Sequence, residues 1–305
     1  MTRKSRVLLS FLSFVAVSCA AYFLVRRGVY GWTLFIVLPL LGGGLGSWSI
    51  QPTRVGEAMK IGAIIGALGC SLFLVLGIEG LICVAMAIPV LIPCSMLGSL
   101  LVYLGRASSN PKQPAVLGLL VPLTLFFDVT AKPPVYSVTT SIVINSRPER
   151  VWKYAVAFPQ ISANPDWVLR TGVAYPLRTR IGGTGVGTPR QCDLSTGTVE
   201  ERVVVWDEPH LLRFVVTATP PAMRETGLYG EINAKHLNGY YIGKQGEFRL
   251  TPLPHGRTLL VGTSWYQHGL WPAEYWRWWS DAVVHHVHQR VLEHIRLLSE
   301  DDRNY

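Results

Sequence analysis

Long apolar runs fill the first part of the chain. Four of them reach the roughly 20 residues that a helix needs to cross about 30 Å of hydrocarbon, at residues 7–25, 32–50, 61–78 and 81–104. A fifth run, at 115–127, contains Pro122 and is short for a span, so it either crosses the membrane or forms a re-entrant or interfacial segment. The pattern predicts an all-α transmembrane bundle of four or five spans over residues 1–130.

After residue 135 the apolar period becomes that of short strands. Tyr136–Asn145 alternates and is β-branched, which predicts a strand, and Ser146 is placed to cap a short helix that begins near Pro148. Further strands are predicted at 167–175, 186–194, 197–206, 210–217, 244–252 and 257–266, and one long helix at 272–300. A curved antiparallel sheet must bury its concave face, and a long amphipathic helix does so. We therefore expect a second, α+β domain over residues 136–300.

The charges separate the same two parts. Ten of the 28 Lys and Arg residues lie before residue 136, against three of the 19 Asp and Glu residues, and the rest of the chain is nearly balanced. Basic residues at the ends of apolar runs are topology signals, and a balanced soluble domain lacks the basic surface of a nucleic-acid binder. We expect the bilayer as a partner and no nucleic acid.

The distribution of basic residues also predicts an orientation. With the N-terminus inside, seven of them face the cytoplasm (Arg3, Lys4, Arg6, Arg54, Lys60, Arg106 and Lys112), and only Arg26 and Arg27 face outward. This favours a multi-pass protein of a bacterial inner (cytoplasmic) membrane with a cytoplasmic N-terminus. If residues 115–127 span, the second domain lies outside the cytoplasm; if they do not, it lies inside.

Several segments of the second domain resemble a known superfamily. They are the strand Ser141–Asn145, the helix entry Arg147-Pro-Glu-Arg-Val-Trp152, the hairpin segments Phe248–Pro252 and Gly256–Leu260, and the helix segment Arg290–Ile295. With the order of elements, they resemble the START-like (SRPBCC) helix-grip superfamily, the polyketide cyclase/dehydrase, Bet v 1 and lipid-transport group. Ser195–Gly197, Trp206–Pro209, His236–Gly239 and Gly262–Tyr266 are similar to its membrane-anchored bacterial members. The resemblance implies an apolar cavity between sheet and helix, and it implies no single chemistry.

Glu201 is the first candidate for chemistry. Strand alternation puts it on one face with Val199, Val203 and Val205, and it puts Trp206 on the opposite face. A carboxylate in apolar surroundings suits acid–base or ligand-binding work. On the preceding strand Arg190 and Cys192 share one face, so Arg190 is equally able to form a structural ion pair with Glu201.

Histidines mark the long helix. His285 and His288 lie on one side of it, and Asp281 precedes His285 by one turn. Such a pair is compatible with metal ligation, but the sequence has neither a CxxC nor an HExxH spacing. Packing or a polar contact with a ligand is the alternative, and we expect no metal and no cofactor.

Residues 218–243 form a long irregular connection. Segments of this length are often functional, so a lid is one interpretation, with Met223, Glu225, Tyr229, His236 and Tyr240 as its candidate residues. The alternative is an ordinary surface loop. Among the aromatic residues near the long helix, Trp276 and Trp279 are expected to face inward, and Trp271 and Trp278 to face outward or the membrane.

The spans together with the resemblance imply membrane-tethered binding of a hydrophobic small molecule, a lipid or an isoprenoid- or polyketide-like ligand. The expected cavity residues are Arg190, Cys192, Glu201, Glu225, His236, Tyr266, Trp279, His285 and His288. Two alternatives stay open. One is a cyclase- or hydrolase-type enzyme that uses Glu201 with His236 or His285, and the other is a transporter or sensor in which the soluble domain gates the bundle. No residue is assigned as catalytic.

Overall fold

The computed structural model describes residues 3–107 and 113–301, without the side chains of residues 3, 107 and 113–117. The chain forms two compact units. The helical unit contains residues 1–132 together with two later segments, 225–236 and 270–274. The second unit contains residues 133–224, 237–269 and 275–305.

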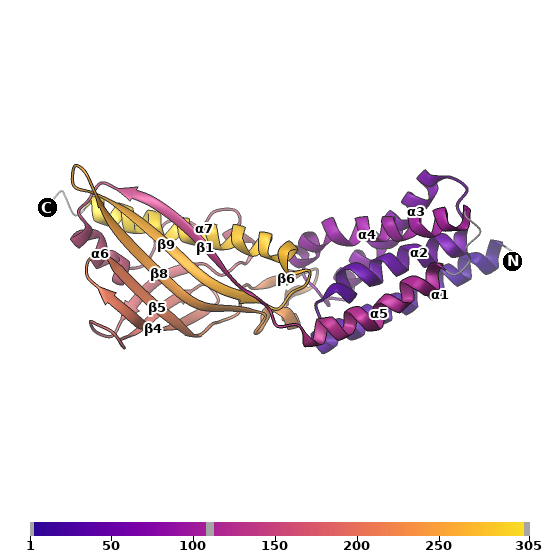
Figure 1. Cartoon of the computed structure of the whole chain (residues 1–305), viewed down its shortest axis with the longest axis horizontal. Coiled ribbons are helices and arrows are strands. Elements are labelled where there is room, and N and C mark those ends of the chain that lie inside the picture. Colours follow the sequence, from indigo (N-terminus) through magenta and orange to yellow (C-terminus); the bar gives the residue numbers. More distant parts are fainter. Residues whose placement is uncertain (1–2, 108–112, 302–305) are drawn as a thin grey trace. The chain divides into compact units, whose positions relative to one another are not determined.

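The helical unit consists of long apolar helices (Figure 1). They are α1 (Arg3–Arg27), a π-helical turn η1 (Thr33–Val37) that continues into α2 (Leu38–Ile50), α3 (Val55–Val75), α4 (Leu81–Ala107) and α5 (Gln113–Thr130). Four stretches of the described residues are long and apolar enough to cross a membrane: Lys4–Arg27, Thr33–Ile50, Val55–Val75 and Leu81–Arg106. They overlap the four expected spans, but the third helix covers residues 55–75 instead of 61–78.

Glycine allows close packing of these helices. A Cβ atom at Gly43 of α2 would lie 1.8 Å from the backbone oxygen of Ser95, and one at Gly98 of α4 would lie 1.9 Å from that of Leu40. The Ser95 hydroxyl donates to the backbone oxygen of Gly62 on α3 over 2.8 Å. Small residues at helix contacts and hydroxyl bonds between helices are typical of membrane bundles.

The fifth apolar run forms α5, longer at both ends than residues 115–127. The Asp128 carboxylate accepts hydrogen bonds from the backbone N–H groups of Trp32 (2.8 Å) and Thr33 (2.9 Å), at the start of η1. The Thr124 and Thr33 hydroxyls are 2.9 Å apart. The carboxyl end of α5 therefore lies at the same end of the helical unit as the connection 28–32. At about 1.5 Å per residue, 18 helical residues extend about 27 Å, close to the thickness of the hydrocarbon layer.

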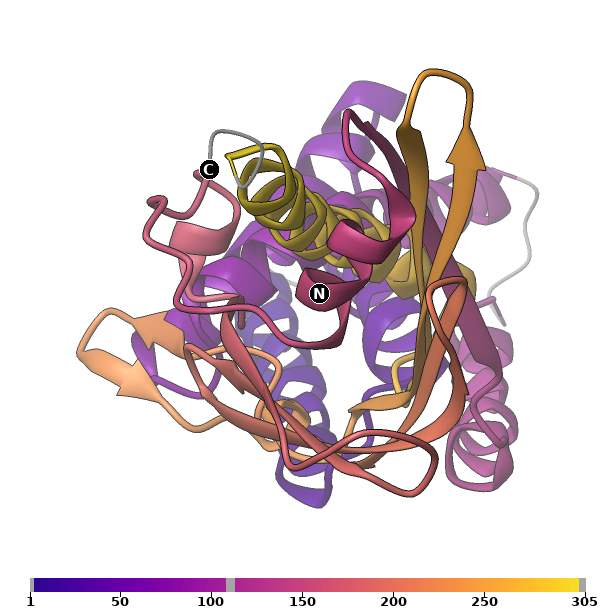
Figure 2. The ribbon, with the colours of Figure 1, turned by 90° about the vertical axis from the view of Figure 1, so that its left-hand side faces the viewer.

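The second unit is built on one antiparallel sheet of seven strands, in the order β1-β9-β8-β5-β4-β3-β2. The strands are β1 (Val135–Ile144), β2 (Pro176–Ile181), β3 (Pro189–Leu194), β4 (Gly197–Asp207), β5 (Leu211–Ala218), β8 (Tyr241–Leu253) and β9 (Arg257–His268). The sheet curves around the long helix α7 (Ala273–Asp301), as Figure 2 shows.

The apolar core lies where the short helix α6 (Pro148–Val156) closes one end of this unit. Trp152 of α6 packs with Leu212, Leu260, Leu292 and other buried residues from the sheet and α7. The predicted helix cap at Ser146 is wrong: Arg147 is the N-cap residue, and the Ser146 hydroxyl is buried without a hydrogen-bond partner.

Two further sequence expectations differ from the structure. Residues 167–175 form no strand; they contain the short 3-10 helix η2 (Leu169–Thr171), and the strand is β2, which follows. A register shift between Val203 and Val205 of β4 brings Trp206 against Trp152, with ring centroids 5.5 Å apart. An extra residue in a strand reverses the alternation beyond it, so Trp206 packs against the core instead of facing away from it.

The irregular connection 218–243 contains a small hairpin. Its strands β6 (Glu225–Gly227) and β7 (Gly230–Ile232) are followed by the 3-10 turn η3 (Lys235–Leu237). Residues 225–236 belong to the helical unit, as do residues 270–274. In that unit the backbone N–H of Trp271 donates to the backbone oxygen of Tyr30 over 3.0 Å, and the Trp271 ring packs edge-on against Phe127 of α5.

Candidate functional site

Arg190 and Glu201 are register partners on β3 and β4. An Arg190 guanidinium N–H donates to the Glu201 carboxylate, and a second N–H donates to the backbone oxygen of Val156 over 3.0 Å. The guanidinium also stacks on the Phe214 ring, 4.5 Å from its centroid. Arg190 is 2 % exposed and Glu201 is 8 % exposed. The two residues therefore form a buried ion pair, the structural alternative that the sequence left open.

This pairing limits what Glu201 is able to do. Burial raises the pKa of Glu201, and the Arg190 charge opposes that rise. Cys192 lies on the same strand as Arg190, and burial, reinforced by the Glu201 charge, raises the pKa of its thiol to about 12. A carboxylate held by an arginine and a thiol that stays protonated are poor groups for acid–base or nucleophilic catalysis.

His285 and His288 meet at a threonine of β1. The Thr140 hydroxyl is 2.8 Å from Nδ1 of His285 and 3.1 Å from Nδ1 of His288. Nε2 of His288 is 2.8 Å from the Ser264 hydroxyl of β9. Burial lowers the pKa of His288 to about 4, and His285 adds to this effect. Both ring nitrogens of His288 are thus occupied by hydroxyl groups, as in a hydrogen-bonded packing residue and unlike a free metal ligand.

Tyr266 of β9 is fully buried, and its hydroxyl donates to the Asp281 carboxylate of α7 over 2.5 Å. Burial and the Asp281 charge raise the pKa of Tyr266. Asp281 also accepts a hydrogen bond from Arg277, 3.2 Å away. Tyr266 therefore links the sheet to the first half of α7, the part that precedes the core residues of this helix.

The side of α7 that carries Trp279, Val283 and Val287 is only partly buried, whereas Val284 in the same half of the helix is 6 % exposed. Trp279, Val283, Val287 and Val291 follow one another at four-residue spacing and so lie on one face. Val291 belongs to the core and is 8 % exposed, whereas the three preceding residues are only partly buried. The indole N–H of Trp279 is nevertheless buried, and it has no hydrogen-bond partner. The neighbouring aromatic residues follow the expectation: Trp276 is 5 % exposed and Trp278 is 65 % exposed.

Glu225 and His236, two of the expected cavity residues, lie in the helical unit instead. There His236 Nε2 is 3.0 Å from the Cys83 thiol of α4 and 3.9 Å from the Glu225 carboxylate. His236 Nδ1 is 3.3 Å from the carboxylate of Glu79, which accepts a hydrogen bond of 2.7 Å from the Tyr30 hydroxyl. The lid assignment of Glu225 and His236 rested on position within a long loop, and nothing in the local pattern indicates Cys83 or Glu79 as their neighbours.

A groove of about 1100 Å³ also lies within the helical unit. Its walls are α1 residues between Phe11 and Arg26, the end of α3 with the following turn, and residues 229–235. Much of the apolar surface of α1 is exposed, as expected of a helix that faces lipid. We therefore expect acyl chains of the bilayer to fill this groove.

No family model matches the chain, and no curated protein matches it. Solved structures similar to it include a norcoclaurine synthase mutant from Thalictrum flavum (10 % identity, 57 % of this chain and 99 % of that one, TM-score 0.36). A second is the Zhui aromatase/cyclase from Streptomyces sp. R1128 (17 % identity, 56 % of this chain and 96 % of that one, TM-score 0.35). A third is the protein XoxI from Bacillus cereus (14 % identity, 55 % of this chain and 99 % of that one, TM-score 0.35).

The sheet order, the early helix α6 and the long C-terminal helix in the concave face define a helix-grip fold. The fold expected from the resemblance is thereby confirmed. The class is a helix-grip domain that follows four helices able to span a membrane.

Proposed function

We propose that the helix-grip domain binds one hydrophobic molecule between its sheet and the first half of α7. The membrane helices hold this domain at the bilayer that supplies the molecule. Tethering suits such a ligand because a molecule of low solubility then needs no diffusion step through water.

The observation that carries the proposal is the unpaired indole N–H of Trp279. A buried donor without a partner costs free energy, about 1–3 kcal/mol, and such groups call for an explanation. Val283 and Val287 continue the same face of α7 and remain partly accessible, whereas Val291 is packed in the core. An apolar lining with a few placed polar groups is the usual composition of a small-molecule site.

This lining favours a particular class of ligand. The partly accessible valines suit an acyl or isoprenoid chain, and the Trp279 N–H suits one carbonyl, ester or hydroxyl oxygen. A membrane lipid or an isoprenoid-like molecule with such an oxygen meets both conditions. The enzyme alternative has less support, because Arg190 holds Glu201 and His236 belongs to the helical unit.

Photo-crosslinking in the full-length protein tests the proposal. The chain is reconstituted in nanodiscs that contain a phospholipid with a diazirine in its acyl chain, is irradiated, and is digested for peptide mapping. We expect labelled peptides from α7 around Val283 and Val287, in addition to those from the membrane helices. Labels confined to the membrane helices would contradict the proposal.

Two substitutions on α7 sharpen this test. Val287→Trp fills the space next to the proposed ligand and should remove the label from this helix. If there is room for a ligand, the added ring causes little destabilisation, whereas overpacking a filled core costs about 1–3 kcal/mol. Leu297→Trp is the matched control on the same helix, because Leu297 is 44 % exposed and should tolerate the ring without loss of label.

A further inference from the structure

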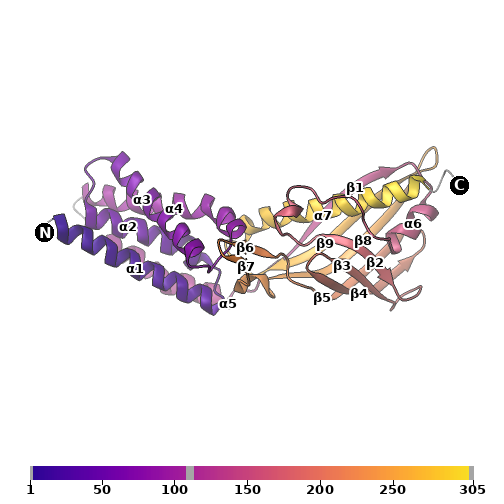
Figure 3. The same cartoon turned by 180° about the vertical axis from the view of Figure 1, so that it is seen from behind.

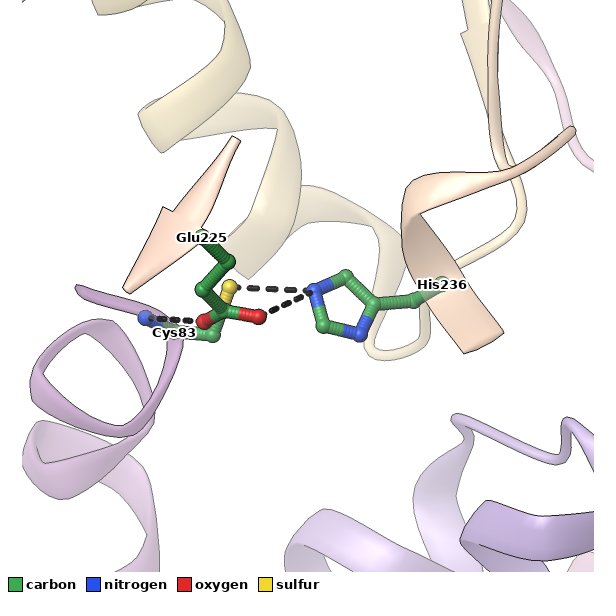
Figure 4. Close-up of side chains that lie close together, drawn as sticks. All are labelled: Cys83, Glu225 and His236. Atoms are coloured by element: carbon green, nitrogen blue, oxygen red, sulfur yellow. Dashed lines mark hydrogen bonds and ion pairs between the residues drawn. The ribbon is translucent and has the colours of Figure 1, made fainter. Parts of the chain in front are cut away.

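Three side chains with different metal-binding atoms converge in the helical unit (Figure 4). Cys83 comes from the first turn of α4, Glu225 from β6 and His236 from η3; Figure 3 shows β6 and β7 beside the start of α4. One atom of each residue, the thiol sulfur, a carboxylate oxygen and a ring nitrogen, lies within 4.8 Å of the other two. The chain brings them together across 142 and 153 residues of sequence.

The cluster contains polar atoms that are buried and unsatisfied. Glu225 is fully buried; its Oε1 accepts a hydrogen bond of 3.2 Å from the backbone N–H of Cys83, but its Oε2 has no hydrogen-bond partner. Nδ1 of His236 also lacks one, although the Glu79 carboxylate is 3.3 Å away. Buried polar groups are nearly always paired, so the unpaired Glu225 Oε2, 3.9 Å from Nε2 of His236, points to a group that binds between these two atoms.

The charges of the cluster indicate the sign of that group. Glu79 and Glu225 are both buried, and the ion-pair partner that the described residues offer each of them is His236. A single imidazole is thus shared by two buried carboxyl groups, and a bound cation would add the positive charge that this group of side chains lacks.

The donor set indicates which cation. A thiolate, an imidazole and a carboxylate together are ligands of Zn²⁺, whereas Ca²⁺ and Mg²⁺ take oxygen ligands. In a tetrahedral zinc site, bond lengths of about 2.0–2.3 Å place donor atoms roughly 3.3–3.8 Å apart. The distances from His236 Nε2 to Cys83 Sγ (3.0 Å) and to Glu225 Oε2 (3.9 Å) lie on either side of that range, so small side-chain movements suffice.

The surroundings have the organisation of a second coordination shell. A zinc-bound histidine usually donates its other ring N–H to a carboxylate, which fixes the ring. Glu79 stands at Nδ1 of His236, and Tyr30 in turn donates to Glu79. Gly80 leaves room for the Glu225 side chain, because a Cβ atom at position 80 would lie 2.1 Å from Glu225 Cγ.

We propose that Cys83, Glu225 and His236 bind one Zn²⁺ ion, with a fourth position left for water, and that Glu79 is a positioning residue for His236. The ion joins residues 225–236 to the first turn of α4. Such a site makes the attachment of the hairpin to the membrane helices depend on metal. The site is independent of the ligand proposed for the helix-grip domain.

Metal binding by the full-length protein in nanodiscs tests this proposal. The protein is stripped with a chelator and titrated with Zn²⁺ against a chromophoric competitor, and with Co²⁺ under anaerobic conditions. We expect about one equivalent of Zn²⁺ per chain, and a Co²⁺ spectrum with a thiolate-to-metal charge-transfer band and the visible bands of a tetrahedral site. The Co²⁺ spectrum is recorded on the unmodified chain, so it tests metal binding through a thiolate even if substitutions impair folding.

Matched substitutions assign the ligands. Cys83→Ser, His236→Gln and Glu225→Gln should each weaken Zn²⁺ binding by at least about tenfold, since even outer-shell partners such as Glu79 are worth about 10- to 100-fold. Cys94→Ser on the same helix and Glu231→Gln on the same hairpin should leave binding unchanged. The proposal is overturned if the unmodified chain takes up no Zn²⁺, if the Co²⁺ complex lacks the thiolate band, or if the control substitutions weaken binding as much as the ligand substitutions.

Discussion

The Arg190–Glu201 pair places two opposite charges on neighbouring strands, with less than a tenth of either residue exposed. Removal of one partner from a buried pair leaves the other charge uncompensated, at a cost of about 3–5 kcal/mol. We expect Arg190→Met and Glu201→Leu each to destabilise the protein by this amount, measured by chemical unfolding. The double variant should lose less than the sum of the two. Losses below about 1 kcal/mol, the value of surface pairs, would show that the pair is not desolvated.

His288 gives the fold a pH dependence of predictable sign. Its pKa is about 4 in the fold and about 6.5 in an unfolded chain, so the unfolded state binds more protons between these values. Stability should therefore fall as the pH is lowered from about 6.5 to 4, by on the order of 3 kcal/mol for this group.

The measurement is the thermal midpoint of the protein in nanodiscs between pH 7 and 4.5, followed by tryptophan fluorescence. His288→Gln should flatten the dependence, whereas His210→Gln, at an exposed turn, should not. An equal slope in unmodified protein and His288→Gln would rule out this origin of the effect.

At the scale of elements, the side of the membrane on which the second domain lies depends on whether α5 crosses it. Its carboxyl end contacts Trp32 and Thr33 through Asp128, and the connection 28–32 is reached after a single span from the N-terminus. Residues 225–236 pack at this same end, against Glu79 and Cys83. If α1 to α4 cross the bilayer, these contacts place the N-terminus and the carboxyl end of α5 on opposite sides. The basic residues favour a cytoplasmic N-terminus.

Reporter fusions test this orientation. A periplasmic-type reporter, alkaline phosphatase, should be active at the C-terminus of the full chain and inactive when fused after Ala107, before α5. A reporter that is fluorescent only in the cytoplasm should give the reverse pattern. Cytoplasmic signals from both fusions would mean that α5 does not cross.

Features that depend on local interactions were predictable from the sequence, and features that depend on long-range contacts were not. Spans, the strand β1 and the helix α7 were predictable because their apolar periods are local and strong. The pairing of Arg190 with Glu201 followed from alternation on adjacent strands. The bulge that turns Trp206 inward was not predictable, because one extra residue reverses the alternation and no local pattern marks it. The contact of His236 with Cys83 joins residues 153 positions apart, and no periodicity reports such a distance.

At the scale of the whole molecule, we propose a membrane anchor joined to a ligand-binding domain. Four described helices are able to cross a bilayer, and a helix-grip domain follows them. One face of α7 carries the unpaired Trp279 N–H and the partly accessible Val283 and Val287. This arrangement predicts that the ligand is held by the domain and not only by the lipid-facing helices. Occupancy should therefore respond to a change on α7 that leaves the membrane helices untouched.

Native mass spectrometry of the full-length protein, released from detergent under mild activation, measures this occupancy directly. The unmodified chain should retain one hydrophobic molecule after weakly held lipids have dissociated. Trp279→Phe replaces the indole and its N–H by a smaller phenyl ring and should lower the retained fraction, whereas Trp278→Phe, the same change at a residue 65 % exposed, should not change it. An unmodified chain that retains nothing, or equal retention in both variants, would contradict the proposed binding of a hydrophobic ligand at α7.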